Sequence, residues 1–431
     1  MRQEDNKIKP KLQRYTISDE TGRFSCYTER MKEVEQNNPK QKSTILITCS
    51  AGLVDYLKQE VEQLGYQSGA SHSTGIEIEG NQYDAMLLNL HLRTAHSVLF
   101  LLKQFECTSP EELYHNVNDL PWEDMISPDE YLSVVGKIDT GYVKNSMFAN
   151  LKVKDAIVDR IADRTGSRPD SGKERDRVVV QLYWKDDRCW LYLNTSGLKA
   201  SDRTYRKIPH QAPLRESLAA AIIIATGYDG SSPLICPMCG SGTLAIEAAL
   251  IATRRAPGLL RTNYGFMHMK YFDEPAWQNM RREALKKSKA RGGKASFTPA
   301  PIVATDIDPK AIEATRNNAM TAGVSHLIDL NVCDFADTVI PPGPGIIVMN
   351  PEYGFRLGEI EKLKKTYERI GDFFKQKCAG YTGYIFTGNP DLAKKVGLRA
   401  GRRFEFYNAN IECRLLKYEL YAGTRRKRTD S

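Results

Sequence analysis

Apolar and polar residues follow two different patterns along the chain, and the change falls near residue 203. Before it, alternating apolar runs predict strands at residues 43–49, 75–79, 131–135, 178–184 and 189–194. Apolar positions three or four residues apart predict helices at residues 53–64, 111–116 and 148–165, and residues 87–103 are predicted to run from a helix into a strand. Strands mixed with helices in this way predict a compact α+β module.

From residue 233 onward, apolar strands, loops and helices alternate regularly. The predicted strands are residues 233–235, 301–305, 327–332, 345–349 and 381–386, and the predicted helices are residues 244–252, 308–322, 359–378 and 390–400. This order is typical of a doubly wound parallel sheet, which a hairpin of residues 404–407 and 416–421 would complete. A long segment at 252–300 interrupts it. Its basic helix, residues 277–290, either faces a substrate or forms a solvated surface.

The two ends of the chain are polar. Residues 1–43 predict a flexible extension, and residues 423–431 a basic tail. No run of about 18 apolar residues predicts a membrane span, and the first residues lack the apolar stretch of a secretory signal, so we expect a cytoplasmic protein without a membrane partner. The net charge of +8 permits binding to nucleic acid without requiring it.

Nine cysteines are spread from Cys26 to Cys413. An odd number in a long chain without a secretion signal predicts reduced thiols rather than a disulfide framework. Cys236 and Cys239 form the single CxxC pair. Because no second pair follows at zinc-site spacing, we expect no metal site.

A glycine-rich loop joins the first strand of the second pattern to its helix. Its sequence, CPMCGSGT at 236–243, lets the backbone approach a ligand, and the helix that follows offers unpaired N–H groups to an anion. A redox dithiol of Cys236 and Cys239 is the alternative, although a second cysteine before a Gly-Ser-Gly turn is atypical of one. We expect the loop to contribute six residues to a cofactor site, which are Cys236, Pro237, Met238, Gly240, Ser241 and Gly242.

Carboxylates follow the next two strands. Asp306 ends the second strand, where a carboxylate can accept both hydroxyls of a ribose, and Ile307 lies beside it. Asp308 is predicted to cap the next helix, with Pro309 at its first position. After the third strand, Asp334 could accept an adenine amino group and Phe335 could cover the ring. These features favour a nucleoside cofactor.

The fourth strand ends in the sequence NPEYG at 350–354, which resembles the (Asn/Asp)-Pro-Pro-(Tyr/Phe) motif of methyltransferases that act on exocyclic or amide nitrogens. The lone pair of such a nitrogen is delocalised until its hydrogens are held out of that geometry. The Asn350 side-chain oxygen and the Pro351 carbonyl can accept those hydrogens, and Tyr353 can stack on the target base. Positioning supplies most of the catalytic effect in this arrangement.

Together these motifs resemble the THUMP-domain guanine-N2 methyltransferases of ribosomal RNA, the RlmL/YpsC type within the UPF0020 methylase family. The resemblance rests on PMCGSGT at 237–243, TDIDP at 305–309 and NPEYGFR at 350–356, and it extends over residues 44–422. It implies a ferredoxin-like part at 44–100 and a THUMP domain at 101–200. A class I Rossmann-like methyltransferase domain, with a mostly parallel seven-stranded sheet, is implied at 201–422. The implied cofactor is S-adenosylmethionine.

The resemblance also implies an RNA partner, either 23S ribosomal RNA or, alternatively, transfer RNA. Because proteins hold RNA mainly by its backbone and shape, basic residues of the helix at 148–165 are candidate phosphate contacts. They are Lys152, Lys154, Arg160 and Arg164. The alternative for these four residues is an ordinary solvated helix face.

Two residues depart from the family pattern. Cys236 replaces an aspartate that is placed to meet the cofactor's ammonium group, and a thiol supplies no full charge there. Glu352 replaces the second proline of the amino-methylation motif, where it either points outward or pairs with Arg356. These two exchanges leave a third hypothesis open, which is an RNA-binding protein without catalytic activity.

Overall fold

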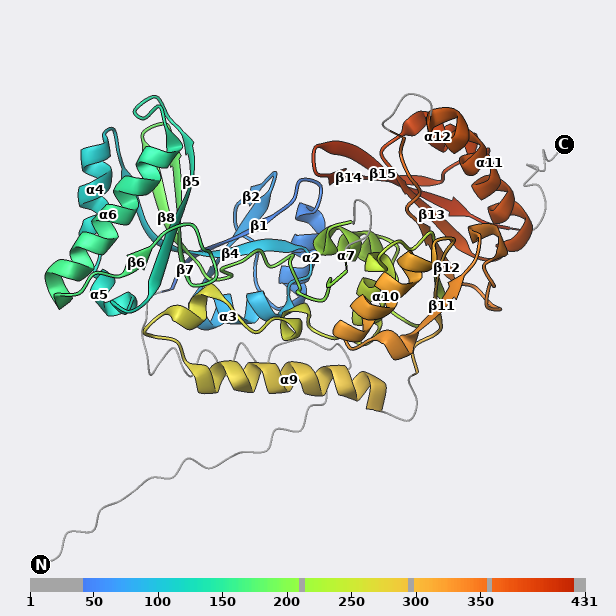
Figure 1. Cartoon of the computed structure of the whole chain (residues 1–431), viewed down its shortest axis with the longest axis horizontal. Coiled ribbons are helices and arrows are strands. Elements are labelled where there is room, and N and C mark those ends of the chain that lie inside the picture. Colours follow the sequence, from blue (N-terminus) through green and yellow to red (C-terminus); the bar gives the residue numbers. More distant parts are fainter. Residues whose placement is uncertain (1–41, 209–213, 294–297, 355–358, 422–431) are drawn as a thin grey trace, which may run out of the picture.

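The computed structural model describes residues 42–208, 214–293, 298–354 and 359–421, which form two mixed α/β halves (Figure 1). The first half is built on one eight-stranded sheet in the order β2-β3-β1-β4-β8-β7-β5-β6. Its strands are β1 (Ser43–Cys49), β2 (Ser71–His72), β3 (Gly75–Gly80), β4 (Ala95–Glu106), β5 (Tyr131–Asp139), β6 (Asp170–Ser171), β7 (Val178–Lys185) and β8 (Arg188–Asn194). The long strand β4 pairs with β1 and with β8, so it joins strands β1–β3 to strands β5–β8 in one sheet.

The helices of the first half are α2 (Val54–Gln63), α3 (Gln82–His91), α4 (Pro110–Asn118), α5 (Trp122–Met125) and α6 (Ser146–Thr165). Local chemistry sets their ends. Asn145 caps the start of α6 by accepting a hydrogen bond from the Met147 N–H, and Gly166 ends the helix in the left-handed conformation that glycine adopts readily. The expected passage from helix to strand at 87–103 is confirmed, with α3 beginning five residues earlier than predicted.

The second half contains a seven-stranded sheet in the order β11-β10-β9-β12-β13-β15-β14. Strands β9 (Leu234–Pro237), β10 (Ile302–Asp306), β11 (Ile328–Val332), β12 (Ile346–Met349) and β13 (Thr382–Thr387) are parallel. The hairpin of β14 (Arg402–Asn408) and β15 (Ile411–Glu419) adds the antiparallel edge. The predicted doubly wound sheet and its closing hairpin are confirmed.

The helices of this half are α7 (Glu216–Ala225), α8 (Thr243–Ala252), α10 (Pro309–Thr321), α11 (Glu359–Lys377) and α12 (Pro390–Lys395). The strand order reverses beside β9, because β10 and β11 lie on one side of it and β12 and β13 on the other. Ligands of such sheets bind outside the carboxyl ends of the strands at this reversal. The glycine-rich loop, Asp306 and Asn350 all follow strand ends at this edge.

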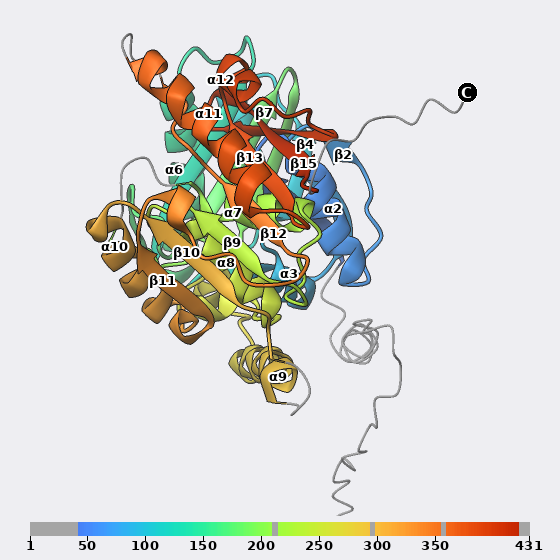
Figure 2. The ribbon, with the colours of Figure 1, turned by 90° about the vertical axis from the view of Figure 1, so that its right-hand side faces the viewer.

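The inserted segment supports the junction between the halves. Its helix α9 (Glu274–Gly293) runs beneath α3, as both views show (Figures 1 and 2). Trp277, Met280 and Ala284 of α9 are buried against Met86 and Leu90 of α3. The inner face of α9 therefore packs on the first half. The two alternatives stated for this helix, facing a substrate or forming a solvated surface, did not include this packing.

Candidate active site

The glycine-rich loop between β9 and α8 is held in a left-handed turn. Met238, Gly240 and Gly242 all have positive φ angles, of 59°, 56° and 80°. A Cβ on Gly242 would lie 2.4 Å from Thr315 Cγ2, whereas one on Gly240 would meet nothing within 4 Å. Gly242 is therefore required for packing against α10. Gly240 borders open space, as a loop that receives a ligand must.

Asp306 fixes this loop from the neighbouring strand. Its Oδ2 accepts a hydrogen bond from the Gly240 N–H at 2.9 Å, and its Oδ1 accepts one from the Asp308 N–H at 3.0 Å. Each oxygen keeps capacity for a further bond, and the side chain is partly exposed. Ile307 is 69% exposed beside it. The predicted cap is confirmed, since Asp308 accepts from the Lys310 N–H and Pro309 opens α10.

The two cysteines of the loop lie in a setting unlike that of a redox dithiol. Cys236 is 1% exposed within β9, and burial raises its pKa well above the ordinary value. Burial also raises the pKa of Cys239 to about 12. A reactive thiol needs a lowered pKa, because the thiolate is the nucleophile. The geometry gives the redox alternative no support, and Cys236 supplies no negative charge near neutral pH.

Asp334 and Phe335 begin a short 3₁₀ turn after β11. Asp334 Oδ1 accepts from the Ala336 N–H at 2.9 Å and from the Arg369 guanidinium at 2.8 Å. Phe335 is 5% exposed, and its ring meets Phe373 edge-on at 6.0 Å. Arg369 also lies over the Phe335 ring, 4.9 Å from its centre. Arg369 comes from α11, and nothing in its local sequence marks it for this role.

Asn350 and Tyr353 form a hydrogen-bonded pair at the end of β12. The Tyr353 hydroxyl donates to Asn350 Oδ1 at 2.7 Å. The Tyr353 ring is 9% exposed and packs edge-on against Phe386, so the ring must move before it can stack on a base. Burial raises the pKa of Tyr353, which keeps its hydroxyl protonated and able to donate.

Backbone contacts hold the rest of this motif. Asn389 Nδ2 donates to the Tyr353 carbonyl at 3.0 Å, and the Tyr367 hydroxyl donates to the Glu352 carbonyl at 3.2 Å. The Glu352 side chain is exposed, which agrees with the first of the two alternatives, that it points outward. Arg356, its partner in the second alternative, lies outside the described residues. Asn389 was not among the residues expected at the site, although Asn before Pro390 is a recognisable helix start.

The four basic residues predicted to contact RNA lie on α6 and differ in their contacts. Arg160 is committed to Glu123 through two hydrogen bonds of 3.0 and 2.7 Å, and Lys154 pairs with Asp155 at 2.7 Å. The Arg164 side chain is 60% exposed and lies 3.8 Å from Glu123. Lys152 lies over the Phe148 ring, 5.7 Å from its centre. Arg164 and Lys152 are therefore more available to a phosphate than Arg160.

Two kinds of feature are absent from the described ranges. No helix there has the length and apolar character needed to cross a bilayer. Within the same ranges, no three acidic, histidine or cysteine side chains come together as a metal site.

Three family models match consecutive parts of the chain. They describe the RlmL ferredoxin-like domain at residues 44–99, the THUMP domain at residues 107–194 and the RMKL-like methyltransferase domain at residues 203–417. The matched ranges follow the two halves of the structure, with the first two models on the eight-stranded sheet and the third on the seven-stranded one.

Similar proteins include the putative RNA methyltransferase slr0064 of Synechocystis sp., 32% identical over 87% of this chain and 96% of its own length. The ribosomal RNA large subunit methyltransferase K/L of Syntrophotalea carbinolica is 35% identical over 86% of this chain, which spans 53% of that relative. Among solved structures, SMU.472, a putative methyltransferase complexed with SAH, aligns with a TM-score of 0.77 and 25% identity. That alignment covers 90% of this chain and 100% of SMU.472.

Proposed function

Since this chain belongs to the RMKL-like methyltransferase family, we propose that it methylates RNA at the exocyclic N2 of a guanine in 23S ribosomal RNA. The names of its relatives support RNA as the class of substrate. Guanine N2 is proposed from the resemblance of residues 350–354 to the amino-methylation motif, and 23S RNA from the large-subunit relatives. The chain spans about half the length of those large-subunit relatives. The proposal therefore concerns only the reaction of the part of those relatives that this chain matches.

S-adenosylmethionine is the methyl donor, and it supplies an electrophilic methyl group on a sulfonium. The residues at the carboxyl ends of the strands fit it. Gly240 borders open space at the start of α8, and Asp306 stands at the end of β10 with lone pairs left for ribose hydroxyls. Asp334, oriented by Arg369, is assigned to the adenine amino group. The neutral thiol of Cys236 leaves the methionine ammonium to partners other than this side chain.

The hydrogen bond between Tyr353 and Asn350 is the observation that carries the proposal. Asn350 Oδ1 accepts this hydrogen bond at 2.7 Å, which supports the proposal that it can also accept one from a guanine amino group. In the proposed reaction, the amino group replaces the Tyr353 hydroxyl as the hydrogen-bond donor to Asn350 Oδ1 and donates a second hydrogen bond to the Pro351 carbonyl. The nitrogen lone pair then points at the methyl group, and the guanine has to leave its stack to reach this position. Tyr353, released from Asn350, can stack on the base.

Incubation with isotopically labelled methyl donor and separate pools of ribosomal and transfer RNA tests the proposal. We expect label in 23S RNA, recovered as N2-methylguanosine after digestion. Label only in transfer RNA would overturn the substrate, and label at adenine N6 would overturn the acceptor atom. Cofactor binding without label in either pool would favour the non-catalytic hypothesis.

Asn350→Ala tests the role of the acceptor oxygen. We expect the methyl-transfer rate to fall about 10²–10³-fold, as when one positioning group is lost from a preorganised site, while cofactor affinity by calorimetry stays unchanged. Asn317→Ala, in the second half of α10, is the matched control and should retain full activity. Retained activity in Asn350→Ala would refute the assignment.

We propose the same domain bounds that the sequence predicts. The ferredoxin-like part is at 44–100, the THUMP domain at 101–200 and the methyltransferase domain at 201–422. The three matched ranges support this order. Lys152, Lys154, Arg160 and Arg164 stay proposed phosphate contacts, with Arg160 the weakest candidate because Glu123 already binds it.

A further inference from the structure

The eight-stranded sheet has two unlike faces in its THUMP half. One face is apolar and lies beneath α4, α5 and α6, where Leu182 of β7 and Leu191 of β8 are fully buried. Successive residues of a strand point to opposite faces. Tyr183 of β7, and Trp190 and Tyr192 of β8, therefore lie on the other face, where they form a small cluster with Leu46, Leu99 and Leu101.

The strand register aligns these rings with a cation. Lys137 of β5 lies opposite Tyr183, Tyr183 lies opposite Trp190, and Trp190 lies opposite Gln104 of β4. The four residues form one row across four strands. Tyr192 belongs to the next row, and its ring meets Tyr183 at 5.6 Å with the planes 64° apart.

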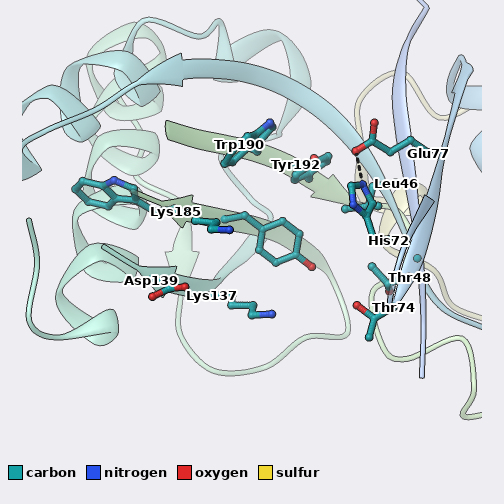
Figure 3. Close-up of a pocket in the computed structure, with 13 residues that line it drawn as sticks. Leu46, Thr48, His72, Thr74, Glu77, Lys137, Asp139, Lys185, Trp190 and Tyr192 are labelled. Atoms are coloured by element: carbon teal, nitrogen blue, oxygen red, sulfur yellow. Dashed lines mark hydrogen bonds and ion pairs between the residues drawn. The ribbon is translucent and has the colours of Figure 1, made fainter. Parts of the chain in front are cut away.

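This face is hollowed (Figure 3). The hollow has a volume of about 430 Å³ and is lined by residues of the first sheet and its turns. This volume lies within the range of about 300–1,000 Å³ that is typical of small-ligand sites. Thr48 and Thr74 place hydroxyls in its lining, and the ion pair of His72 and Glu77, 3.0 Å apart, lies on its border. The hollow thus combines aromatic rings, hydroxyl groups and charges.

Two cations border the rings. The side chains of Lys137 and Lys185 are exposed, and neither forms an ion pair within the described part of the chain. Asp139 lies opposite Lys185 in the register and adds one acceptor. Aromatic faces beside exposed lysines match a ligand that has flat rings on an anionic backbone, because the rings take up the bases and the cations the phosphates.

We propose that this face binds a short unpaired segment of RNA, with a base stacked on Trp190 or Tyr183 and the adjoining phosphates at Lys137 and Lys185. Paired bases in a duplex present only their edges, so ring stacking selects unpaired nucleotides. The inference rests on the proposed function for RNA as the substrate class, and it adds a binding site separate from the residues at the ends of β9, β10 and β12.

Tryptophan fluorescence tests the site directly. The other three of the four tryptophans, Trp122, Trp184 and Trp277, are at most 1% exposed, so Trp190 is the tryptophan that a ligand can reach. The full chain would be titrated with an alternating cytidine–uridine RNA octamer and with an abasic chain of the same length. We expect saturable quenching by the octamer and weak quenching by the abasic chain. Trp190→Phe should abolish the quenching and keep most of the affinity, measured by anisotropy.

Variants separate stacking from charge. Trp190→Ala should weaken octamer binding about 5- to 100-fold, the range found for loss of one base-stacking ring. Lys137→Gln and Lys185→Gln should each weaken binding and reduce the salt-dependence slope by about 0.7, as for one phosphate contact on a single strand. Lys362→Gln and Lys365→Gln, at exposed positions of α11, are the matched controls and should change neither quantity for this short RNA.

The proposal is overturned if the octamer leaves Trp190 unquenched, or if Trp190→Ala and both lysine variants bind it like the parent chain. Methyl transfer measured on the same preparations separates this site from the proposed function. Methylation of ribosomal RNA without octamer binding would remove only the sheet-face site. Saturable quenching that Trp190→Phe abolishes, in a protein that methylates no RNA, would support the site and remove only the proposed reaction.

Discussion

At the scale of single residues, the site depends on positions where the backbone conformation and the neighbouring atoms restrict which residue can be present. Gly242 has a φ of 80° and sits against Thr315, while Gly240 has a φ of 56° and borders open space. The two glycines of one Gly-Ser-Gly turn thus have different roles. Gly242 permits close packing against Thr315, and Gly240 leaves space for a ligand. Asn350 is likewise fixed by one particular partner, the hydroxyl of Tyr353.

Gly242→Ala should destabilise the protein more than Gly227→Ala, although both glycines have a positive φ. A Cβ at this position would lie 2.4 Å from Thr315 Cγ2, so we expect a loss of more than about 2 kcal/mol in the free energy of unfolding, together with weaker cofactor binding. Gly227→Ala is the control, because its φ is 77° and a Cβ would meet nothing within 4 Å. That change should cost about 1 kcal/mol. Equal losses by chemical denaturation would refute the packing argument.

At the scale of elements, the connection between α3 and β4 leads into the strand that joins the ferredoxin-like strands to the THUMP part. Helix α3 ends at His91, and β4 begins at Ala95. Both histidines of this stretch are held neutral. Desolvation lowers the pKa of His91 to about 3 and that of His96 to about 4, in each case with help from nearby cations. Protonation of either imidazole is therefore unfavourable in the folded chain.

This connection should make the fold sensitive to acid. A histidine with a lowered folded pKa contributes stability above its ordinary value near 6.5, and that contribution is lost as the pH falls from there toward 4 and 3. Urea unfolding at pH 7.5, 6, 5 and 4 should show the loss. His91→Gln combined with His96→Gln should flatten the profile, whereas His326→Gln, at an exposed site, should leave its shape unchanged. A parallel profile in the double variant would contradict the assignment.

At the scale of the whole molecule, the first half and the methyltransferase half share one hydrophobic core. Ile45 and Leu57 of the first half belong to the same buried cluster as Leu244 and Phe406 of the second. Tyr56 of α2 also stacks on Phe406 of β14, with ring centres 5.5 Å apart. The THUMP part has a separate core beneath α4 and α6. We infer that the ferredoxin-like part is structurally continuous with the methyltransferase-fold half.

A buried ion pair crosses the same junction. Arg203 is 1% exposed and binds Glu247 of α8, which is fully buried, and it also donates to the carbonyl of Arg93 before β4. The Tyr205 hydroxyl donates to the other oxygen of Glu247 at 3.0 Å. The ion pair therefore ties the start of β4 to the helix that follows the glycine-rich loop.

Glu247→Ala should destabilise the protein by about 3–5 kcal/mol, because it leaves the Arg203 charge buried without a partner. Chemical denaturation measures the loss, and Arg203→Met with Glu247→Leu should restore most of it, since an apolar pair of similar volume removes the buried charge. Glu361→Ala breaks the exposed pair with Lys364 and is expected to change nothing measurable. A loss in Glu247→Ala no larger than in that control would show that the buried pair is dispensable.

The sequence by itself determined the features that depend on neighbouring residues. The apolar periodicity set the parallel sheet and its helices, since each strand or helix buries its own apolar face. The glycine-rich loop and the motif at 350–354 were recognisable because a tight turn and an amide beside a proline are local requirements of the backbone. The Asp308 cap of α10 was predictable for the same reason.

Only the tertiary structure decided which distant residues meet. Arg369 reaches Asp334 from a helix 35 residues further along the chain, and no local pattern specifies that distance in space. The open aromatic face is a second case. Strand parity separates Tyr183 and Trp190 from the core, but the side on which α4 and α6 pack decides which face stays uncovered. Helix packing and strand pairing join residues that are far apart in the sequence. The local pattern of apolar and polar residues therefore could not predict them.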